Sequence, residues 1–459
     1  RDLFLPAAGG AQRMPGDYLY YAGRSFELRE GSWGVLRVHG PGQGGDLRPL
    51  PGHEAMPAPA ASVCPPGAPM RHFDVAAIDT PLPMLNADRL PGSRGGRAGK
   101  VYVLAADRSA VSSGRTAASP LVLHVNVGDC LTVTLANATT AGPVSFHADM
   151  LAADPRSSAG VAAGAEPPQA VEPGGSRTYT LYASPEVGET AALVRDWGDV
   201  LRNPGLGLYG AVIVGPRGSR YTDARTGADV SGASAWQVDV HPPGAPAYRD
   251  DSLFFQEEDA GIGTHRMPYT VRVEGTVGIN YTSEPLMARL ERNNDTAALF
   301  RRDSRGDPAT PLIEAYPGDP VKLHVLVPWS EQAQVFSLEG HRWREEVGRP
   351  GSPLLNSVRM GGLEALTLSL EGGASSPGDY LYGDHREPYR EAGLWGLFRV
   401  RAGCDNTGTG LRPLDGGCPL TVAGLWRPVA LWGSAAVAVA GIAVRRRRRR
   451  CPTLDGMLG

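Results

Sequence analysis

The chain has 459 residues, of which 42% are apolar, and it contains 60 glycines and 40 prolines. This length exceeds one ordinary domain, and Gly and Pro placed between short runs rich in Val, Leu and Tyr favour an all-β chain over a helical bundle. The net charge of −3 drops to −9 once the six arginines at 445–450 are set aside, and this acidic body argues against nucleic-acid binding.

One block of sequence occurs twice. PGDYLYYAGRSFELREGSWGVLRV at 15–38 returns as PGDYLYGDHREPYREAGLWGLFRV at 377–400, with Trp33 and Gly34 matched by Trp395 and Gly396. Its first half alternates polar and bulky residues as a half-buried strand does, and a Trp-Gly run follows as a second strand. The sequence therefore predicts the same β-hairpin at two places.

The block resembles the final hairpin of a cupredoxin domain from the multicopper oxidases, whose pattern is roughly P-G-x-W-x-x-H-C-H-x-x-x-H-x-x-x-G-[ML]. Laid on 377–394, the pattern meets Pro377, Gly378, Tyr380, Gly393 and Leu394. Its four metal positions fall on Gly383, Asp384, His385 and Tyr389, and in the earlier block on Tyr21, Ala22, Gly23 and Glu27. The resemblance implies an all-β fold of tandem cupredoxin-like Greek-key β-sandwich domains.

Compositional shifts set the expected boundaries. A hairpin that normally ends a domain stands at 15–38 without room before it for other strands, so we expect the C-terminal part of a longer protein, preceded by further cupredoxin domains. The expected parts are 1–45, the C-terminal hairpin of a truncated cupredoxin-like domain; 46–69, a linker; 70–220, a cupredoxin-like domain; 221–234, a linker; 235–402, a second such domain; 403–427, a linker; 428–450, a hydrophobic anchor or sorting tail with an Arg run; and 451–459, a tail.

Ligand motifs of the family can be placed on both complete domains. VSFHADML at 144–151 stands where the family has H-x-H-G and keeps His147, whereas the second H-x-H of that domain falls on 195–199, which holds no histidine. We expect 196–199 to form a turn with structural hydrogen bonds. AQVFSLEGHRW at 333–343 places Gln334, Ser337 and Glu339 at ligand positions and keeps only His341. His124 and His324 fall on alternating strands, and we expect both to face outward.

The residue types exclude the two copper centres of the family from this segment. A blue copper site needs a Cys thiolate with two imidazoles, and a trinuclear centre needs about eight histidines in H-x-H pairs. No H-x-H occurs, and no Cys stands in a ligand position. The remaining candidate metal ligands are His147, Glu339, His341, Asp384 and His385, a set that suits Mn²⁺ or another divalent ion. The alternative is a buried polar network in which Arg386 or Arg342 holds the carboxylates.

Cysteines and the C-terminal stretch bear on location. Cys64 with Cys130, and Cys404 with Cys418, are disulfide candidates that spacing does not settle, and both pairings fit an oxidising compartment. Residues 428–444 are uncharged for 17 residues, which spans about 26 Å as a helix. With the arginines that follow, they predict a membrane anchor or a removable sorting tail. We therefore expect an extracytoplasmic protein: periplasmic, secreted or on the cell surface.

The resemblance is nearest to large bacterial multicopper oxidases of the manganese-oxidase type. It implies a copper-dependent, O2-reducing oxidase that acts on a small reductant or a metal ion, with this segment mainly as scaffold. The alternative is a copper-free cupredoxin-like binding or surface protein held by its C-terminal tail.

Overall fold

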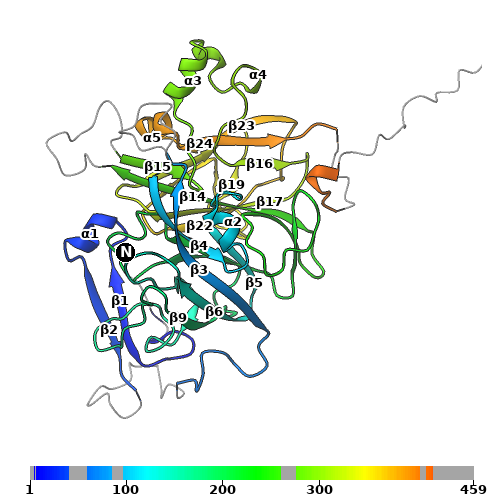
Figure 1. Cartoon of the computed structure of the whole chain (residues 1–459). Coiled ribbons are helices and arrows are strands. Elements are labelled where there is room, and N and C mark those ends of the chain that lie inside the picture. The colour runs from blue at the N-terminus through cyan, green and yellow to red at the C-terminus, as the bar shows by residue number, and fades with distance from the viewer. Residues whose placement is uncertain are drawn as a thin grey trace, which may run out of the picture. The chain divides into compact units, whose positions relative to one another are not determined.

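The computed structural model describes residues 5, 7–40, 59–84, 97–259, 275–403 and 410–416 (Figure 1). All of them belong to one compact unit, residues 1–417. The described chain is mainly β, arranged as a hairpin and two β-sandwiches, which confirms the predicted fold class. No helix in these ranges is both long and apolar enough to span a membrane. The predicted anchor at 428–450 lies outside them.

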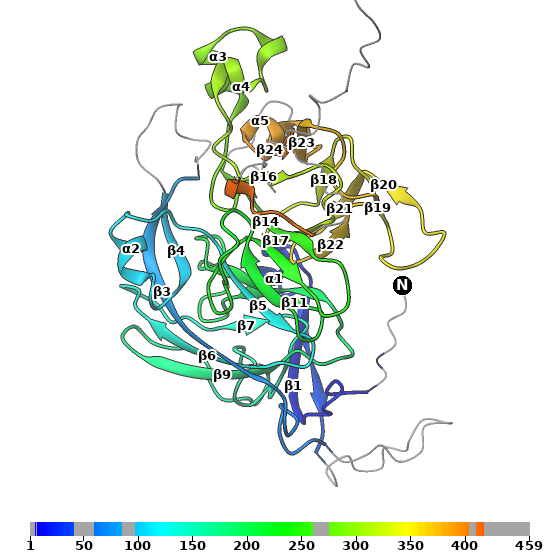
Figure 2. The same cartoon turned by 90° about the vertical axis from the view of Figure 1, so that its right-hand side faces the viewer.

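The first hairpin pairs β1 (Gly16–Tyr21) with β2 (Trp33–Val38) in antiparallel fashion, and α1 (Ser25–Arg29) lies in the connection. Among the described residues these two strands form a sheet of their own. Asp17 Oδ2 of β1 accepts from the Ala165 amide over 2.8 Å, so the hairpin lies against a loop of the first sandwich, in the lower part of Figure 2.

The first sandwich consists of two sheets with strand orders β4-β3-β6-β9-β8 and β5-β11-β10-β7. Its core lies between them and holds side chains such as Phe73, Leu123, Val133 and Val212. A turn at Gly128, φ +91°, reverses the alternating stretch from β5 into β6, a conformation that favours glycine. The elements are β3 (Met70–Leu82), β4 (Arg97–Leu104), α2 (Arg108–Ser112), β5 (Leu121–Asn126), β6 (Cys130–Asn137), β7 (His147–Ala148), β8 (Ala152–Ala153), β9 (Ser176–Tyr182), β10 (Thr190–Arg195) and β11 (Tyr209–Gly215).

The second sandwich has sheets ordered β12-β13-β14-β17-β22, with β15 also on β14, and β16-β24-β23-β18-β21. Its strands are β12 (Arg220–Asp223), β13 (Gln237–His241), β14 (Tyr248–Asp259), β15 (Gly275–Ile279), β16 (Leu312–Ala315), β17 (Val321–Trp329), β18 (Gln334–Leu338), β21 (Ser357–Met360), β22 (Ala365–Ser369), β23 (Gly378–Asp384) and β24 (Trp395–Val400), and β19 (Trp343–Arg344) pairs with β20 (Leu354–Leu355) outside the two sheets. Strand β12 takes up the first residues of the segment that we predicted as the linker 221–234.

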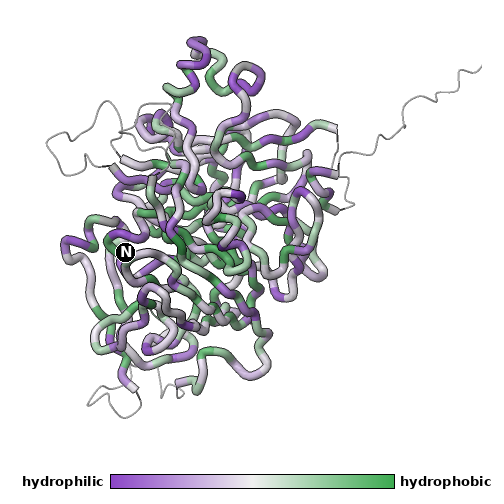
Figure 3. Tube along the Cα trace, in the orientation of Figure 1, coloured by the Kyte–Doolittle hydropathy of each residue, from purple (hydrophilic) through white to green (hydrophobic). Residues whose placement is uncertain are grey.

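Short helices lie in the connections of this sandwich and after its last strand. They are α3 (Leu286–Arg292), α4 (Arg302–Arg305), α5 (Glu387–Ala392) and the 3-10 turns η1 (Thr296–Ala298) and η2 (Leu414–Gly416). Helix α5 fills the connection of the second hairpin: Pro388 stands in its first turn and Gly393, φ +117°, ends it in the left-handed conformation. Figure 3 shows hydrophobic segments in the strands of both sandwiches and mostly hydrophilic ones around α3 and α4.

A further apolar cluster joins the two sandwiches. Tyr209 of β11 stacks on Phe254 of β14 with ring centroids 5.7 Å apart, and its hydroxyl donates to Gln256 Oε1 over 2.9 Å. Leu326 of β17 and Tyr281 belong to the same cluster. The sheet that contains β11 and the sheet that contains β14 and β17 therefore pack against each other across the junction.

This junction overturns our expectation for two histidines. His124 and His324 are both buried, at 5% and 3% exposure, instead of facing outward. His324 Nε2 contacts Asp250 Oδ2 over 3.0 Å and its Nδ1 contacts Thr367 Oγ1 over 2.9 Å, while His124 Nε2 contacts the Ala235 carbonyl over 2.9 Å. Burial lowers the pKa of His124, although Asp250 opposes the shift. The two strands do alternate as expected, but the face that carries the histidine contacts other residues of the protein and not water.

Candidate functional site

Asp384 occupies the cysteine position of the family motif and is bound by main-chain amides. It ends β23, is 1% exposed, and its Oδ1 accepts from the amides of Val335 (3.1 Å) and Arg386 (2.9 Å). Burial raises the pKa of Asp384, and the two amides oppose that shift. The carboxylate thus links the end of β23 to β18 and to the start of the turn into α5. This role resembles the predicted alternative, in which Asp384 belongs to a buried polar network. The guanidinium of Arg386 points instead to the Ala333 carbonyl and Gln332.

His341 is engaged at both ring nitrogens. Its Nε2 accepts from the Ser375 amide over 3.1 Å, so Nδ1 carries the proton and donates to the Glu339 carbonyl over 3.0 Å. The ring packs against Tyr380 and Phe398, with centroids 4.6 and 4.8 Å away, and burial lowers its pKa. With both nitrogens in use, the ring holds the loop after β18 in place and offers no free lone pair.

The predicted carboxylate and imidazole ligands of this sandwich do not converge. Asp384 lies opposite Phe336, whereas the Glu339 amide donates to the carbonyl of Leu381, which precedes Asp384 by three residues on β23. At 3.3 Å per residue this offset is about 10 Å. The side chains of Glu339 and His385 are exposed. Across the described ranges, no three His, Cys, Asp or Glu side chains form a group that could hold a metal ion.

The other corner holds what we call the Arg195 cluster: Tyr21, His147, Asp149, Arg195 and Trp197. The Arg195 guanidinium, at the end of β10, donates to Asp149 Oδ1 over 2.8 Å and to the Tyr21 hydroxyl. It lies 5.2 Å from each ring centroid of Tyr21 and Trp197, a cation–π arrangement. Burial would lower the pKa of Arg195, but Asp149 and Tyr21 raise it above the ordinary value. Residue 21, a histidine position in the family motif, thus ties the first hairpin to the sandwich.

His147 is a member of this cluster and not a free ligand. Its Nδ1 lies 2.5 Å from the Ala159 carbonyl and its Nε2 lies 3.0 Å from Asp149 Oδ1. Each ring nitrogen therefore faces a hydrogen-bond acceptor. Burial would raise the pKa of Asp149, yet Arg195 and His147 outweigh it and hold that pKa below the usual range. Arg195 and His147 therefore share one carboxylate.

The neighbouring turn confirms the prediction for 196–199. Asp196 is fully buried; its Oδ1 accepts from the Ser145 amide over 2.6 Å, and its Oδ2 accepts from the Asp199 amide and Asn203 Nδ2, each over 2.9 Å. Burial raises its pKa against these hydrogen bonds. The carboxylate organises the loop that replaces the second H-x-H.

Two features escaped the sequence reasoning. The Tyr21–Arg195 contact joins residues 174 positions apart, and no periodic signal announces it. Glu257 is fully buried on β14, where its Oε1 accepts from Ser330 Oγ (2.8 Å) and the Gln332 amide (2.7 Å). Burial raises the pKa of Glu257 to about 7 despite these bonds. The run FFQEED, with acids on an otherwise apolar strand, was the available signal.

A cavity of about 500 Å³ separates the first hairpin from the loop 160–170. Its wall includes Leu19, Trp33 and Val35 of the hairpin and Trp197 and Leu201 of the sandwich. The cavity adjoins the Arg195 cluster through Trp197, so it combines aromatic walls with a polar end.

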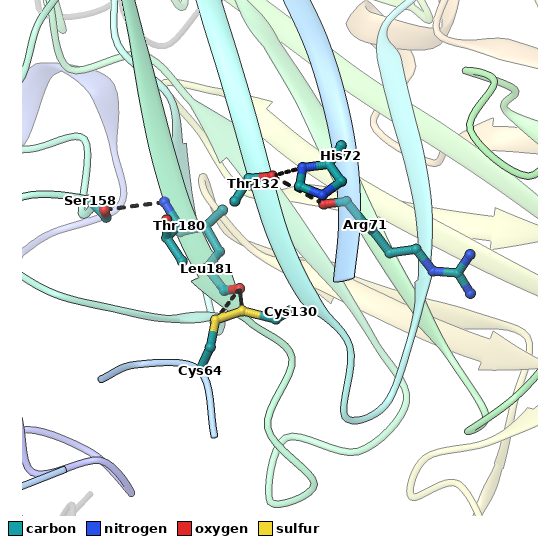
Figure 4. Close-up of a disulfide and its surroundings, with 8 residues drawn as sticks. All are labelled: Cys64, Arg71, His72, Cys130, Thr132, Ser158, Thr180 and Leu181. Atoms are coloured by element: carbon teal, nitrogen blue, oxygen red, sulfur yellow. Dashed lines mark hydrogen bonds between the residues drawn. A yellow bond between two sulfur atoms is a disulfide. The ribbon is translucent and has the colours of Figure 1, made fainter. Parts of the chain in front are cut away.

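Cys64 and Cys130 form a disulfide with Cα atoms 5.9 Å apart (Figure 4). It joins the segment before β3 to the start of β6, where Cys130 pairs with Tyr182 of β9. The other candidates, Cys404 and Cys418, lie outside the described residues.

Comparison with known proteins finds similar solved structures but no matching family. No family model and no curated protein matches. The chain is similar to a solved multicopper oxidase (17% identity, 73% of this chain and 91% of that one, TM-score 0.45). It is also similar to the copper nitrite reductase of Nitrosomonas europaea (16% identity, 75% and 98%, TM-score 0.47) and to the laccase of Botrytis aclada (14% identity, 76% and 56%, TM-score 0.47). At these identities the likeness extends to the fold alone.

Proposed function

We propose that this chain is the metal-free scaffold portion of a multicopper-oxidase-type protein. The observation that carries the proposal concerns the positions where the family motif has copper ligands. The histidines at these positions already make hydrogen bonds within the fold. His341 is held by Ser375 and Glu339, and His147 by Asp149 and Ala159. Asp384 takes the place of the thiolate that a blue copper site needs. The residues present do not fit copper, and we derive no redox step from them.

The oxidase activity itself, in this proposal, belongs to further cupredoxin domains on the N-terminal side. They would carry the copper and reduce O2 while oxidising a small reductant or a metal ion. The repeated hairpin supports this arrangement, because the block at 15–38 is of the kind that closes a domain at 377–400. The manganese-oxidase subtype remains a prediction from the resemblance.

We place the protein outside the cytoplasm, anchored or sorted through 428–450. The Cys64–Cys130 disulfide supports this location, since such bonds persist in oxidising compartments.

Metal analysis tests the scaffold proposal. The purified chain is stripped with chelator, dialysed separately against Cu²⁺ and Mn²⁺, desalted and measured by mass spectrometry of the elements. We expect far less than one ion per chain in both cases, and the same result for the variant His341→Phe. One tightly held copper per chain, lost in that variant, would refute the proposal.

The cavity behind the first hairpin favours a second candidate function, that of a copper-free binding protein. Its walls of Trp33, Trp197 and Leu201 suit an apolar or aromatic ligand of about 500 Å³ or less. Quenching of tryptophan fluorescence by a panel of small aromatic compounds, compared between the native chain and Trp33→Ala, distinguishes this function; the absence of any saturable quenching would exclude it.

A further inference from the structure

The first hairpin turns toward solvent a face that is buried in the second hairpin. Strand residues 16–20 are identical to 378–382, and 33–38 differ from 395–400 only at Val35 and Leu36, which replace Leu397 and Phe398. Alternation puts Tyr18, Tyr20, Gly34, Leu36 and Val38 on one face of the hairpin. Their counterparts in the second hairpin are Tyr380, Tyr382, Gly396, Phe398 and Val400, which face the sandwich core.

The exposure of matching residues differs sharply. Tyr20 is 63% exposed and Leu36 is 40% exposed, whereas Tyr382 and Phe398 are each 1% exposed. An apolar sheet face of this composition is normally covered by another layer.

The two hairpins nevertheless share their internal geometry. Arg37 grips Asp17 with Nε–Oδ1 and Nη2–Oδ2 distances of 2.7 and 2.8 Å, and Arg399 grips Asp379 with the same two distances. The Tyr18 hydroxyl donates to the Met14 carbonyl over 2.7 Å. The first hairpin is therefore already folded in the form that closes a sandwich.

The second hairpin shows what the first one lacks. Strand β16 runs parallel to the outer edge of β24, and β18 pairs with β23 on the other side. The Tyr382 hydroxyl donates to the Pro311 carbonyl at the start of β16, over 2.5 Å. In the described part of the chain, β1 and β2 pair only with each other, and Tyr20 has no such strand beside it.

We infer that the outer face of β1–β2 is the docking surface for a β-sheet from polypeptide outside residues 1–459. The partner is the rest of a β-sandwich: it adds a strand parallel to β2, a strand antiparallel to β1, and an apolar sheet over Tyr20 and Leu36. Free strand edges on either side of an apolar face require main-chain partners, and a β-sheet supplies both. The inference deepens the proposal of further N-terminal domains, and it holds whether or not those domains carry copper.

A second copy of this chain fits the surface less well. A two-fold axis that pairs β2 with its own copy makes the two strands antiparallel. The matching edge, that of β24, instead accepts a parallel neighbour. The template within the chain therefore favours a different segment over a symmetric dimer.

A fusion tests the inference by supplying the partner in cis. Residues 235–375 are placed directly before Met14 of the chain 14–459, so that Met14 takes the position of Ser376. In a second fusion the helical excursion 285–308 of the added copy is replaced by a Gly-Ser linker, so that a clash with the loop 160–170 is not mistaken for failure to dock. Hydrogen exchange of the amides at 16–21 and 33–38 is then compared with that of the native chain.

We expect these amides to exchange at least a hundredfold more slowly in one or both fusions. The control fusion carries Tyr20→Asp and Leu36→Asp and should lose this protection, while the same substitutions leave the native chain folded. Unchanged exchange in both fusions would overturn the inference. A concentration-dependent dimer of the native chain, abolished by Leu36→Asp, would overturn the assigned occupant in favour of a second copy. Neither result depends on the metal analysis.

Discussion

Removing the charge of Glu257 should flatten part of the pH dependence of stability. Glu257 lies fully buried on β14, and burial raises its pKa from 4.5 to about 7. Because the folded-state pKa lies above the unfolded one, the folded protein binds the proton more tightly. The resulting stability is fully present below pH 4.5 and is lost as the pH rises through 7.

The magnitude follows from the shift. One pKa unit corresponds to 1.36 kcal/mol, so ionisation of buried Glu257 costs about 3 kcal/mol of unfolding free energy above pH 7. Glu257→Gln keeps an oxygen that accepts from Ser330 and the Gln332 amide and carries no charge. We therefore expect the variant to match the native chain near pH 4.5 and to exceed it by up to about 3 kcal/mol at pH 8.

Urea unfolding followed by tryptophan fluorescence at several pH values between 4.5 and 8 measures this difference. Glu339→Gln serves as the matched control, because it makes the same substitution at an exposed side chain, and the pH profile of Glu257→Gln is compared with that of this variant. A difference between Glu257→Gln and the native chain that is the same at pH 5 and pH 8 would refute the reasoning.

Two further substitutions probe the hairpins. Arg195→Met leaves Asp149 without its main cation and should destabilise the chain by about 3 kcal/mol, with faster hydrogen exchange in β1. Glu30→Gln, at an exposed position directly after α1, is the control, and equal exchange in the two variants would contradict the role of Arg195. Tyr382→Phe removes the bond to the Pro311 carbonyl and should cost about 1 kcal/mol in urea unfolding, whereas Tyr20→Phe should cost nothing. Equal losses would show that Tyr20 already has a partner.

More of the fold than of the candidate site could be predicted from the sequence. The repeat at 15–38 and 377–400, the alternation around Gly128 and the turn at Asp196 are local patterns, and each forms as predicted. Local signals of this kind survive because a hairpin or turn is set by neighbours in the chain.

Two of the predicted ligands lie apart for a geometric reason that no sequence pattern records. Glu339 directly follows β18 and Asp384 ends β23, and the register between these two strands separates them along the strand direction. The Arg195 cluster was invisible for the opposite reason, since its members come from three distant segments. Burial of His124 and His324 depended on a second sandwich, and alternation within one strand cannot distinguish water from a neighbouring domain.

The Arg195 cluster also determines what holds the first hairpin to the sandwich. The positive charge between Tyr21 and Asp149 is a guanidinium that is synthesised with the chain. This contact therefore forms from residues of the chain itself.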